Sequence, residues 1–263
     1  MAPVDAAKER FQEVHPGEGF GFPSRFDYAR YSYVYERTRK GGAVLDVGVG
    51  SGQLLNALGL GGEFRRVVGI DIKRHSKFEQ FTEACELLPM DVAEMDFDDG
   101  AFDVVLCEEA LQFIGDRGAA LREMKRVAAP GGRIAFSAFR SLDRHPVYAA
   151  FARLLGEHVG EDARAMMASP FALGDADVLR SLGREAGLAD VRVRIGVGRE
   201  RFPSVDDFVA REAASSPLAG PLGRLDAPAR RALVAALEAE LAPHLDDFGL
   251  AFSNETHVVT ATA

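Results

Sequence analysis

The chain has 263 residues, of which 47% are hydrophobic and 27% charged, as in an ordinary soluble globular protein. Its formal charge of −9 at pH 7 gives a field that repels polyanions, so we expect no nucleic-acid substrate. The N-terminus lacks an apolar leader and no stretch approaches the roughly 18 apolar residues of a membrane span, which predicts a cytoplasmic protein.

The first forty residues differ in composition from the rest of the chain. They contain a glycine-rich loop at residues 17–23, a predicted helix at 27–39 and four of the five tyrosines. Aromatic residues at this density pack against a main domain or form a lid over a ligand. We therefore divide the chain into an N-terminal helical and aromatic lid segment, residues 1–40, and a main domain, residues 41–263.

The sequence VLDVGVGSGQ, residues 44–53, is the strongest local signal. Three apolar residues and Asp46 lead into closely spaced glycines, which predicts a buried strand that ends in a tight turn where a ligand can reach the backbone. A dinucleotide site has GxGxxG at this point, whereas this turn has GxGxG. Because Asp46 would repel a diphosphate and attract an ammonium group, we expect a zwitterionic ligand.

The next predicted strand, residues 66–71, is β-branched and ends in an acid. Asp71 lies near the spacing of roughly 20 residues at which a strand-end carboxylate accepts hydrogen bonds from a ribose. A helix-capping role for Asp71 is the alternative.

Further motifs follow in order: PMDV at residues 89–92, FDVVLCEEALQF at 102–113 and LREMKRVAAPGGRI at 121–134. Together with LDVGVGSG and VVGID, they make the region from 44 to 139 resemble the core of the class I S-adenosylmethionine-dependent methyltransferases. The resemblance implies an α/β fold with a Rossmann-like sheet of seven strands, mostly parallel with an antiparallel last strand. It also implies S-adenosyl-L-methionine as the cofactor and S-adenosyl-L-homocysteine as the product.

The resemblance assigns cofactor contacts to particular positions of this chain. Arg30 and Tyr31 would reach the cofactor carboxylate, and the glycine turn would hold the methionine moiety. The second strand would hold the ribose and one adenine face, the PMDV segment the adenine edge, and the end of the fourth strand would lie beneath the sulfonium. The implied residues are Arg30, Tyr31, Asp46, Gly48, Val49, Gly50, Asp71, Ile72, Asp91, Val92, Cys107 and Glu108. Val49 departs from the small or sulfur-bearing residue common there.

Strand and helix patterns alternate along the core, which predicts parallel strands with crossover helices. We place strands at 43–47, 67–70, 87–90, 102–107 and 133–139, a sixth at 191–197 and the antiparallel last one at 255–260. Residues 140–172 and 203–250 are predicted to form helices, which we call the helical cover, over an acceptor pocket.

Neither the two cysteines nor the acidic residues form a metal or disulfide pattern. Cys85 falls in a predicted helix and Cys107 at a strand end, and the acids at 96, 98 and 99 are typical of a solvated turn. We therefore expect no metal site.

Transfer of a methyl group from a sulfonium depends mainly on alignment and exclusion of water, so the pattern fixes no catalytic residue. Glu109 and His145 are candidate bases near the strand ends. Glu109 facing solvent and His145 as a plain surface residue are the alternatives.

We predict an enzyme that transfers methyl groups to a small or medium organic metabolite, with the O, N or C acceptor and the oligomeric state unresolved. An NAD(P)-dependent oxidoreductase on a related sheet and a non-catalytic module that binds adenosylmethionine are the alternatives.

Overall fold

The computed structural model describes residues 40–50, 52–60, 62–72, 85–215 and 218–263. The strands in these ranges form a sheet in the order β3-β2-β1-β4-β5-β8-β6, with the short β7 paired to β8 off this path. Strands β1 to β5 pair in parallel, and β8 is antiparallel to both β5 and β6. The strands are β1 (Ala43–Val47), β2 (Arg66–Asp71), β3 (Glu86–Pro89), β4 (Phe102–Cys107), β5 (Ala128–Phe139), β6 (Ala189–Phe202), β7 (Leu245–Asp246) and β8 (Gly249–Thr262).

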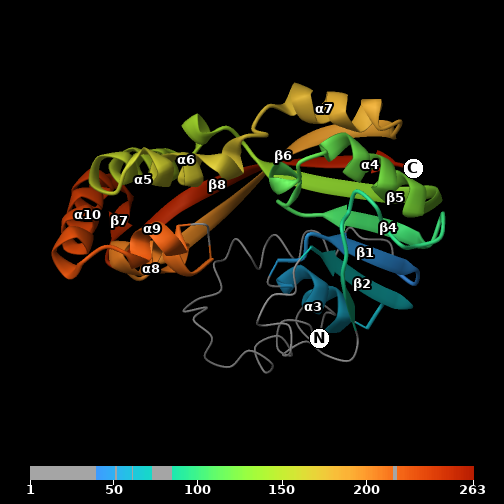
Figure 1. Ribbon diagram of the computed structural model, residues 1–263, viewed down its shortest axis with the longest axis horizontal. Helices are drawn as coiled ribbons and strands as arrows, with labels where there is room; N and C mark the ends of the chain where they lie inside the picture. The colour runs from blue at the N-terminus through green and yellow to red at the C-terminus, as the bar shows by residue number, and fades with distance from the viewer. Residues whose placement is uncertain (1–39, 51, 61, 73–84, 216–217) are drawn as a thin grey trace.

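Helices connect the strands and fall into two groups in space (Figure 1). The helices that pack on the core sheet are α3 (Gln53–Leu60), α4 (Arg117–Val127) and α7 (Ala176–Glu185). Those of the helical cover are α5 (Pro146–His158), α6 (Glu161–Ala168), α8 (Val205–Ser215), α9 (Ala219–Gly223) and α10 (Ala227–Glu240). Short 3-10 turns lie at Leu111–Phe113, Leu142–Arg144, Ser169–Phe171 and Ala242–His244.

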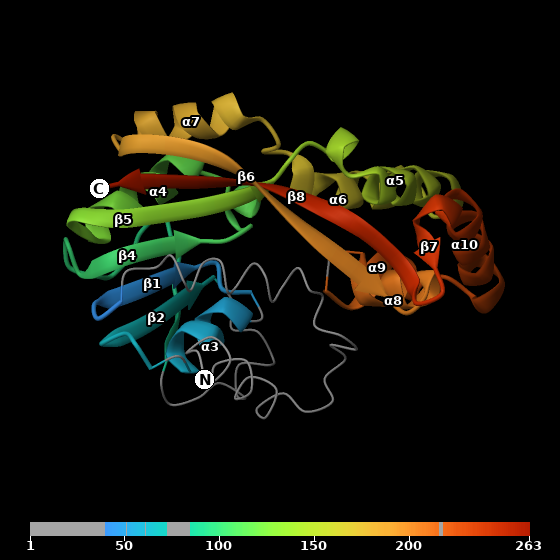
Figure 2. The ribbon, with the colours of Figure 1, turned by 180° about the vertical axis from the view of Figure 1, so that it is seen from behind.

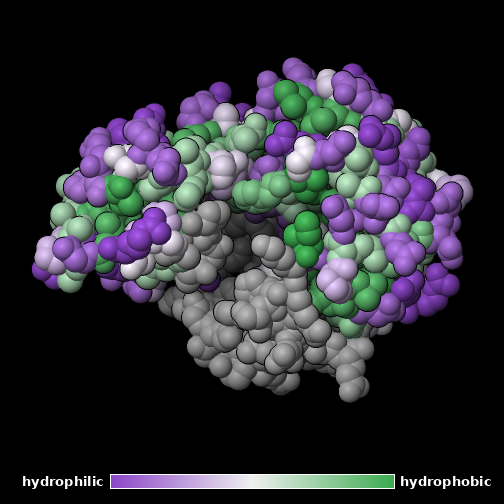
Figure 3. All heavy atoms as spheres, viewed as in Figure 1, coloured by the Kyte–Doolittle hydropathy of each residue, from purple (hydrophilic) through white to green (hydrophobic). Residues whose placement is uncertain are grey.

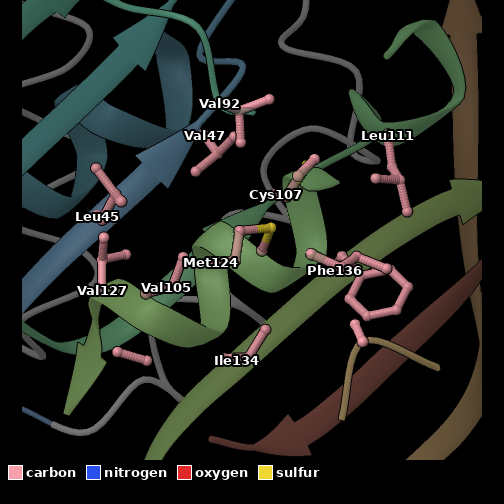
Figure 4. Close-up of a cluster of buried hydrophobic side chains, with 14 of the residues drawn as sticks. Leu45, Val47, Val92, Val105, Cys107, Leu111, Met124, Val127, Ile134 and Phe136 are labelled. Carbon is pink, nitrogen blue, oxygen red and sulfur yellow. The ribbon is translucent and has the colours of Figure 1, made fainter. Parts of the chain in front are cut away.

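The central strands are apolar on both faces, so each face of the sheet can bury a layer of helices. Successive residues of a strand alternate between the faces: Val44 packs with α3, whereas Leu45 packs on the face that α4 and α7 cover. Figure 4 shows the α4 side, where Met124 lies among side chains from β1, β4 and β5. This double burial holds the carboxyl ends of β1, β2 and β4 side by side.

Aspartates fix where three of the helices begin. The side chain of Asp116 accepts the amide proton of Ala119 at the start of α4, and Asp226 accepts that of Ala229 at the start of α10. Asp175 accepts from two amides at the start of α7. These caps satisfy backbone donors that a helix leaves unpaired in its first turn.

Strands β6 and β8 continue past the rest of the sheet as a two-stranded ribbon, the β6–β8 ribbon. Their pairing runs from Ala189↔Thr262 to Phe202↔Leu250. The helical cover gathers around the far end of this ribbon, away from β1–β4, as Figures 1 and 2 show. It has a hydrophobic core of its own, with Phe151, Phe208 and Leu233 fully buried. Hydrophilic and hydrophobic residues alternate over the described surface on the face that Figure 3 shows.

The outer edge of the ribbon is basic. Arg192, Arg194 and Arg199 on β6 are exposed, whereas Arg201 forms a bidentate ion pair with Asp246 at 2.6 Å. Within the described sheet, β6 pairs with β8 on one side only.

The predicted fold class is confirmed, with differences in extent. Strand β5 begins at Ala128, five residues earlier than predicted, because the Pro-Gly-Gly segment joins the strand across a register shift. Strands β6 and β8 are each 14 residues long, far beyond the predicted 191–197 and 255–260. Cys85 lies directly before β3, so its predicted helical position is wrong. The lid segment 1–40 falls outside the described residues except for Lys40.

No helix in the described ranges is both long and apolar enough to cross a bilayer.

We predict that Met124→Ala destabilises the protein by about 2–5 kcal/mol, because Met124 is fully buried and its truncation leaves a cavity between α4 and the sheet. Guanidinium unfolding followed by circular dichroism measures the loss. Met166→Ala on α6 is the matched control, since Met166 is 36% exposed, and a change within about 0.5 kcal/mol is expected there. Equal losses in both variants would contradict this packing.

Candidate functional site

A cleft of about 800 Å³ opens at the carboxyl ends of β1, β2 and β4. This size is suited to a small organic ligand or cofactor. The lining residues come from the ends of β1 and β2, from the start of α3, and from the turns that follow β1, β2, β3 and β4. They are Asp46, Val47, Gly48, Val49, Gly50, Leu54, Ile70, Asp71, Ile72, Met90, Asp91, Val92, Ala93, Glu108, Glu109, Ala110, Phe113, Ile114, Gly115 and Asp116.

The turn after β1 is held in place by backbone hydrogen bonds to β2. The amides of Gly48 and Val49 both donate to the carbonyl of Ile70, at 2.8 and 3.2 Å. Gly48 has a φ of +71°, and a Cβ built on it would lie 2.4 Å from the Cβ of Ala110. Both observations require glycine at this position, because a side chain fits neither the positive φ nor the space beside Ala110. The resulting cradle lets a ligand approach the backbone closely.

Asp71 connects this turn to β2. Its Oδ2 accepts the amide proton of Gly50 at 2.9 Å, so the carboxylate fixes the turn as well as facing the cleft. The predicted helix-capping role falls in the region from 73 to 84, outside the described residues. Ile72, next to Asp71, is 69% exposed and offers an apolar surface on the cleft wall.

Asp91 lies across the cleft in the turn after β3. It is exposed, and its Oδ1 accepts the amide proton of Ala93 at 2.9 Å. Val92 beside it is buried in the core and anchors the turn. Asp91 thus presents a carboxylate to the cleft, an acceptor suited to the amino group at the edge of a purine.

The cleft carries a strongly acidic lining. Six of its residues are carboxylates, at positions 46, 71, 91, 108, 109 and 116, and the described lining contains no lysine, arginine or histidine. Asp46 is 2% exposed, so its charge acts in a medium that screens it weakly. Such a lining favours a cationic ligand and disfavours a pyrophosphate.

The turn after β4 brings Glu108 and Glu109 to the cleft lining. Glu109 has a φ of +49°, which is uncommon for a residue with a side chain and typical of functional sites. Its amide donates to Ser137 Oγ at 3.1 Å, and its carbonyl accepts from Gln112 Nε2 at 2.6 Å. These two bonds hold the unusual backbone in position.

His145 lies outside the cleft lining. It is 1% exposed, and its Nε2 lies 3.0 Å from both the amide nitrogen and the carbonyl oxygen of Glu255, whereas Nδ1 lies 3.2 Å from the carbonyl oxygen of Ser141. Both ring nitrogens therefore bond to backbone, and the surface position considered for His145 is wrong. His145 therefore connects the β5–α5 loop to β8.

Cys107 also lies away from the cleft lining, in contrast to the position that the resemblance implies. Its side chain belongs to the hydrophobic core on the α4 face (Figure 4). Burial, together with the nearby carboxylates of Asp46 and Glu108, raises the pKa of this thiol to about 12. Cys107 therefore remains a neutral thiol at physiological pH.

The structure adds residues that the motifs did not single out. Phe113, Ile114, Gly115 and Asp116 continue the wall after β4, and Phe113 is 59% exposed. The sequence signal for this wall is Phe113, the aromatic residue that ends the FDVVLCEEALQF segment. Arg30 and Tyr31 lie outside the described residues.

A family model described as a methyltransferase domain matches residues 45–136, which contain the whole cleft lining. A demethylmenaquinone methyltransferase of Staphylococcus aureus (strain JH9) is 30% identical over 180 residues, covering 61% of this chain and 73% of that protein. A malonyl-[acyl-carrier protein] O-methyltransferase of Erwinia pyrifoliae is 31% identical over 125 residues, covering 46% of this chain. The match spans 47% of the Erwinia protein, about half its length.

A solved structure shares the fold. Phosphoethanolamine N-methyltransferase 2 of Haemonchus contortus, in complex with phosphomonomethylethanolamine and S-adenosylhomocysteine, superimposes with a TM-score of 0.55. Its identity is 17%, and the match covers 98% of this chain and 56% of that one. At this identity the likeness establishes a common architecture.

We predict that Cys107 in the folded protein resists iodoacetamide at about pH 8, because the reactive thiolate is scarce when the pKa is raised to about 12. A Cys85→Ser variant leaves Cys107 as the remaining thiol, since the chain has two cysteines. Mass spectrometry should show slow labelling in buffer and rapid labelling in guanidinium chloride. Equal labelling rates would contradict the buried position.

Proposed function

Because the chain belongs to the class I S-adenosylmethionine-dependent methyltransferases, we propose that it transfers a methyl group from S-adenosylmethionine to a small or medium organic acceptor. The observation that carries this proposal is the acidic, glycine-cradled cleft at the ends of β1, β2 and β4. The family model and both relatives are methyltransferases and lend no support to the alternative of an NAD(P)-dependent oxidoreductase.

The residues present fit this cofactor. S-adenosylmethionine carries a sulfonium and an ammonium group, which suit a lining with six carboxylates. The Gly48 cradle leaves room where a Cβ would collide with Ala110. A dinucleotide would instead place its pyrophosphate beside Asp46 and Asp71, at a cost in electrostatic repulsion.

We assign cofactor contacts within the cleft on this basis. Asp46 and the Gly48–Gly50 turn would hold the amino-acid end, Asp71 and Ile72 the ribose and one adenine face, and Asp91 with Val92 the adenine edge. Glu108 would lie beside the sulfur. The bound cofactor supplies a methyl group on a positively charged sulfur, which is a good leaving group. The protein then contributes alignment and exclusion of water.

Glu109 is the described residue best placed to take a proton from an acceptor. It lines the cleft at the end of β4, and two hydrogen bonds and a positive φ fix its backbone. His145, the other candidate, is occupied by the backbone on both ring nitrogens. We therefore propose Glu109 as the base, for an acceptor that must lose a proton.

The names of the two relatives point to different acceptors, a quinone and a carrier-bound malonyl group. They support small-molecule metabolism as the setting and leave the acceptor atom open.

We predict that the protein binds S-adenosylmethionine and S-adenosylhomocysteine but not NAD in isothermal titration. Gly48→Ala should weaken cofactor binding by about tenfold or more, because the turn must move away from its positive φ and from Ala110. Gly41→Ala is the control, since Gly41 has a φ of +86° with no atom within 4 Å of an added Cβ. Binding of NAD with no response to the other two ligands would overturn the proposal.

We predict that Glu109→Gln lowers turnover by about 100-fold or more and leaves the Kd of S-adenosylmethionine nearly unchanged, because the amide cannot accept a proton. Transfer of a labelled methyl group into a metabolite extract provides the readout. Glu94→Gln is the control, because Glu94 is exposed in a nearby turn and does not line the cleft. Wild-type turnover in Glu109→Gln, or in the double variant with His145→Ala, would refute a role as base.

A further inference from the structure

Strand β6 combines exposed arginines with exposed apolar residues along one stretch. Arg192, Arg194 and Arg199 are exposed and form no ion pair with the other described residues. Ile195 and Val197 lie between them in sequence and are 53% and 67% exposed. We call these five residues the basic edge.

The backbone of β6 has pairing capacity left on its outer side. Strand β8 pairs with it from Ala189 to Phe202, and β6 is the terminal strand in the order of the described sheet. The register with β8 is continuous from residue 192 to 202, so no bulge disrupts the basic edge. A strand paired on one side presents its remaining amides and carbonyls to an extended segment that approaches the other side.

The side chains of the basic edge are sorted by face. Because successive residues of a strand point to opposite faces, Arg192 and Arg194 share one face, and Ile195, Val197 and Arg199 share the other. A residue on a neighbouring strand packs against the residue opposite it on the same face. A segment that fits both faces therefore alternates, with acids opposite the two arginines and apolar residues opposite Ile195 and Val197.

The charge of the basic edge selects an acidic occupant. Its three guanidinium groups lie close together in a chain whose formal charge is −9. Arginine binds a carboxylate through two parallel hydrogen bonds. The same strand shows such a pair, because Arg201 binds both carboxylate oxygens of Asp246 at 2.6 Å.

We propose that the basic edge binds an extended acidic segment of another protein, which adds a strand to the sheet beside β6. Main-chain hydrogen bonds to β6 supply affinity, and carboxylates opposite Arg192 and Arg194 supply specificity. None of the five residues lines the cofactor cleft, so the inference does not depend on the proposed function.

The probe is a fluorescent peptide, acetyl-EVEVEVEV-amide, titrated into the full-length protein and followed by anisotropy. In an extended conformation its glutamates share one face and its valines the other. We expect it to bind, and to bind more weakly as the salt concentration rises, because exposed charge pairs are screened. The basic peptide KVKVKVKV should bind at least about tenfold more weakly, since like charges opposite each other on neighbouring strands repel. The block peptide EEEEVVVV, of the same composition, should also bind more weakly, because its acids fall on both faces.

The double variant Arg192→Glu, Arg194→Glu should weaken binding of the acidic peptide by about tenfold or more and strengthen binding of the basic peptide. Loss of folding would not produce this reversal, and circular dichroism checks the fold. The matched control is Arg224→Glu, Arg231→Glu, which changes the net charge equally at two exposed residues outside β6. Its affinity for the acidic peptide should remain close to that of the unmodified protein.

Backbone pairing is tested with the acidic peptide N-methylated at its valines and, separately, at its glutamates. One of these two sets of amides must face β6, so at least one modified peptide should lose binding. The inference is overturned if the acidic peptide shows no saturable binding, if the block peptide or both N-methylated peptides bind equally well, or if the folded double variant keeps its affinity. Tighter binding of a peptide with the sequence of residues 191–199 would assign the edge to a second copy of the chain and also overturn it.

Discussion

The antiparallel pairing of β8 with both β5 and β6 is the constraint on which the rest of the structure depends. With β5, it closes the sheet whose other strands place the cofactor cleft at their carboxyl ends. With β6, it continues beyond the sheet and carries the helical cover. One strand therefore fixes the distance between the half of the molecule that suits the donor and the half that we assign to the acceptor. His145 reinforces this junction by bonding to the backbone of Ser141 and Glu255.

The core of the fold could be predicted because each of its strands is a short buried run that ends in a recognisable turn. Val44 to Val47 is apolar except for Asp46, and the glycines that follow admit one backbone path. The ribbon could not be predicted to its full length, because arginines alternate with apolar residues and Gly196 and Gly198 interrupt the pattern. Its strand pairing, a long-range contact, decides where those residues lie.

The candidate site likewise contains residues that the sequence could predict and residues that it could not. Asp46, Asp71 and Asp91 lie at or just after the carboxyl ends of β1, β2 and β3, so a sequence pattern can place them at one edge of the sheet. Ser137 on β5, which accepts the amide proton of Glu109, lies 28 positions further along the chain, and no spacing rule relates the two residues. Cys107 shows the opposite error, because the last residue of a strand can face the core, and only packing against Met124 and its neighbours reveals this.

The exposed arginines on β6 have a consequence for how copies of the chain behave together. Among the described strands, β6 pairs on one side only, so its 14 residues offer backbone donors and acceptors to an extended segment that approaches the other side. Two such edges pairing antiparallel would bring Arg192, Arg194 and Arg199 of one copy close to those of the other, with like charges opposed. Repulsion between these guanidinium groups disfavours such pairing between copies of the chain.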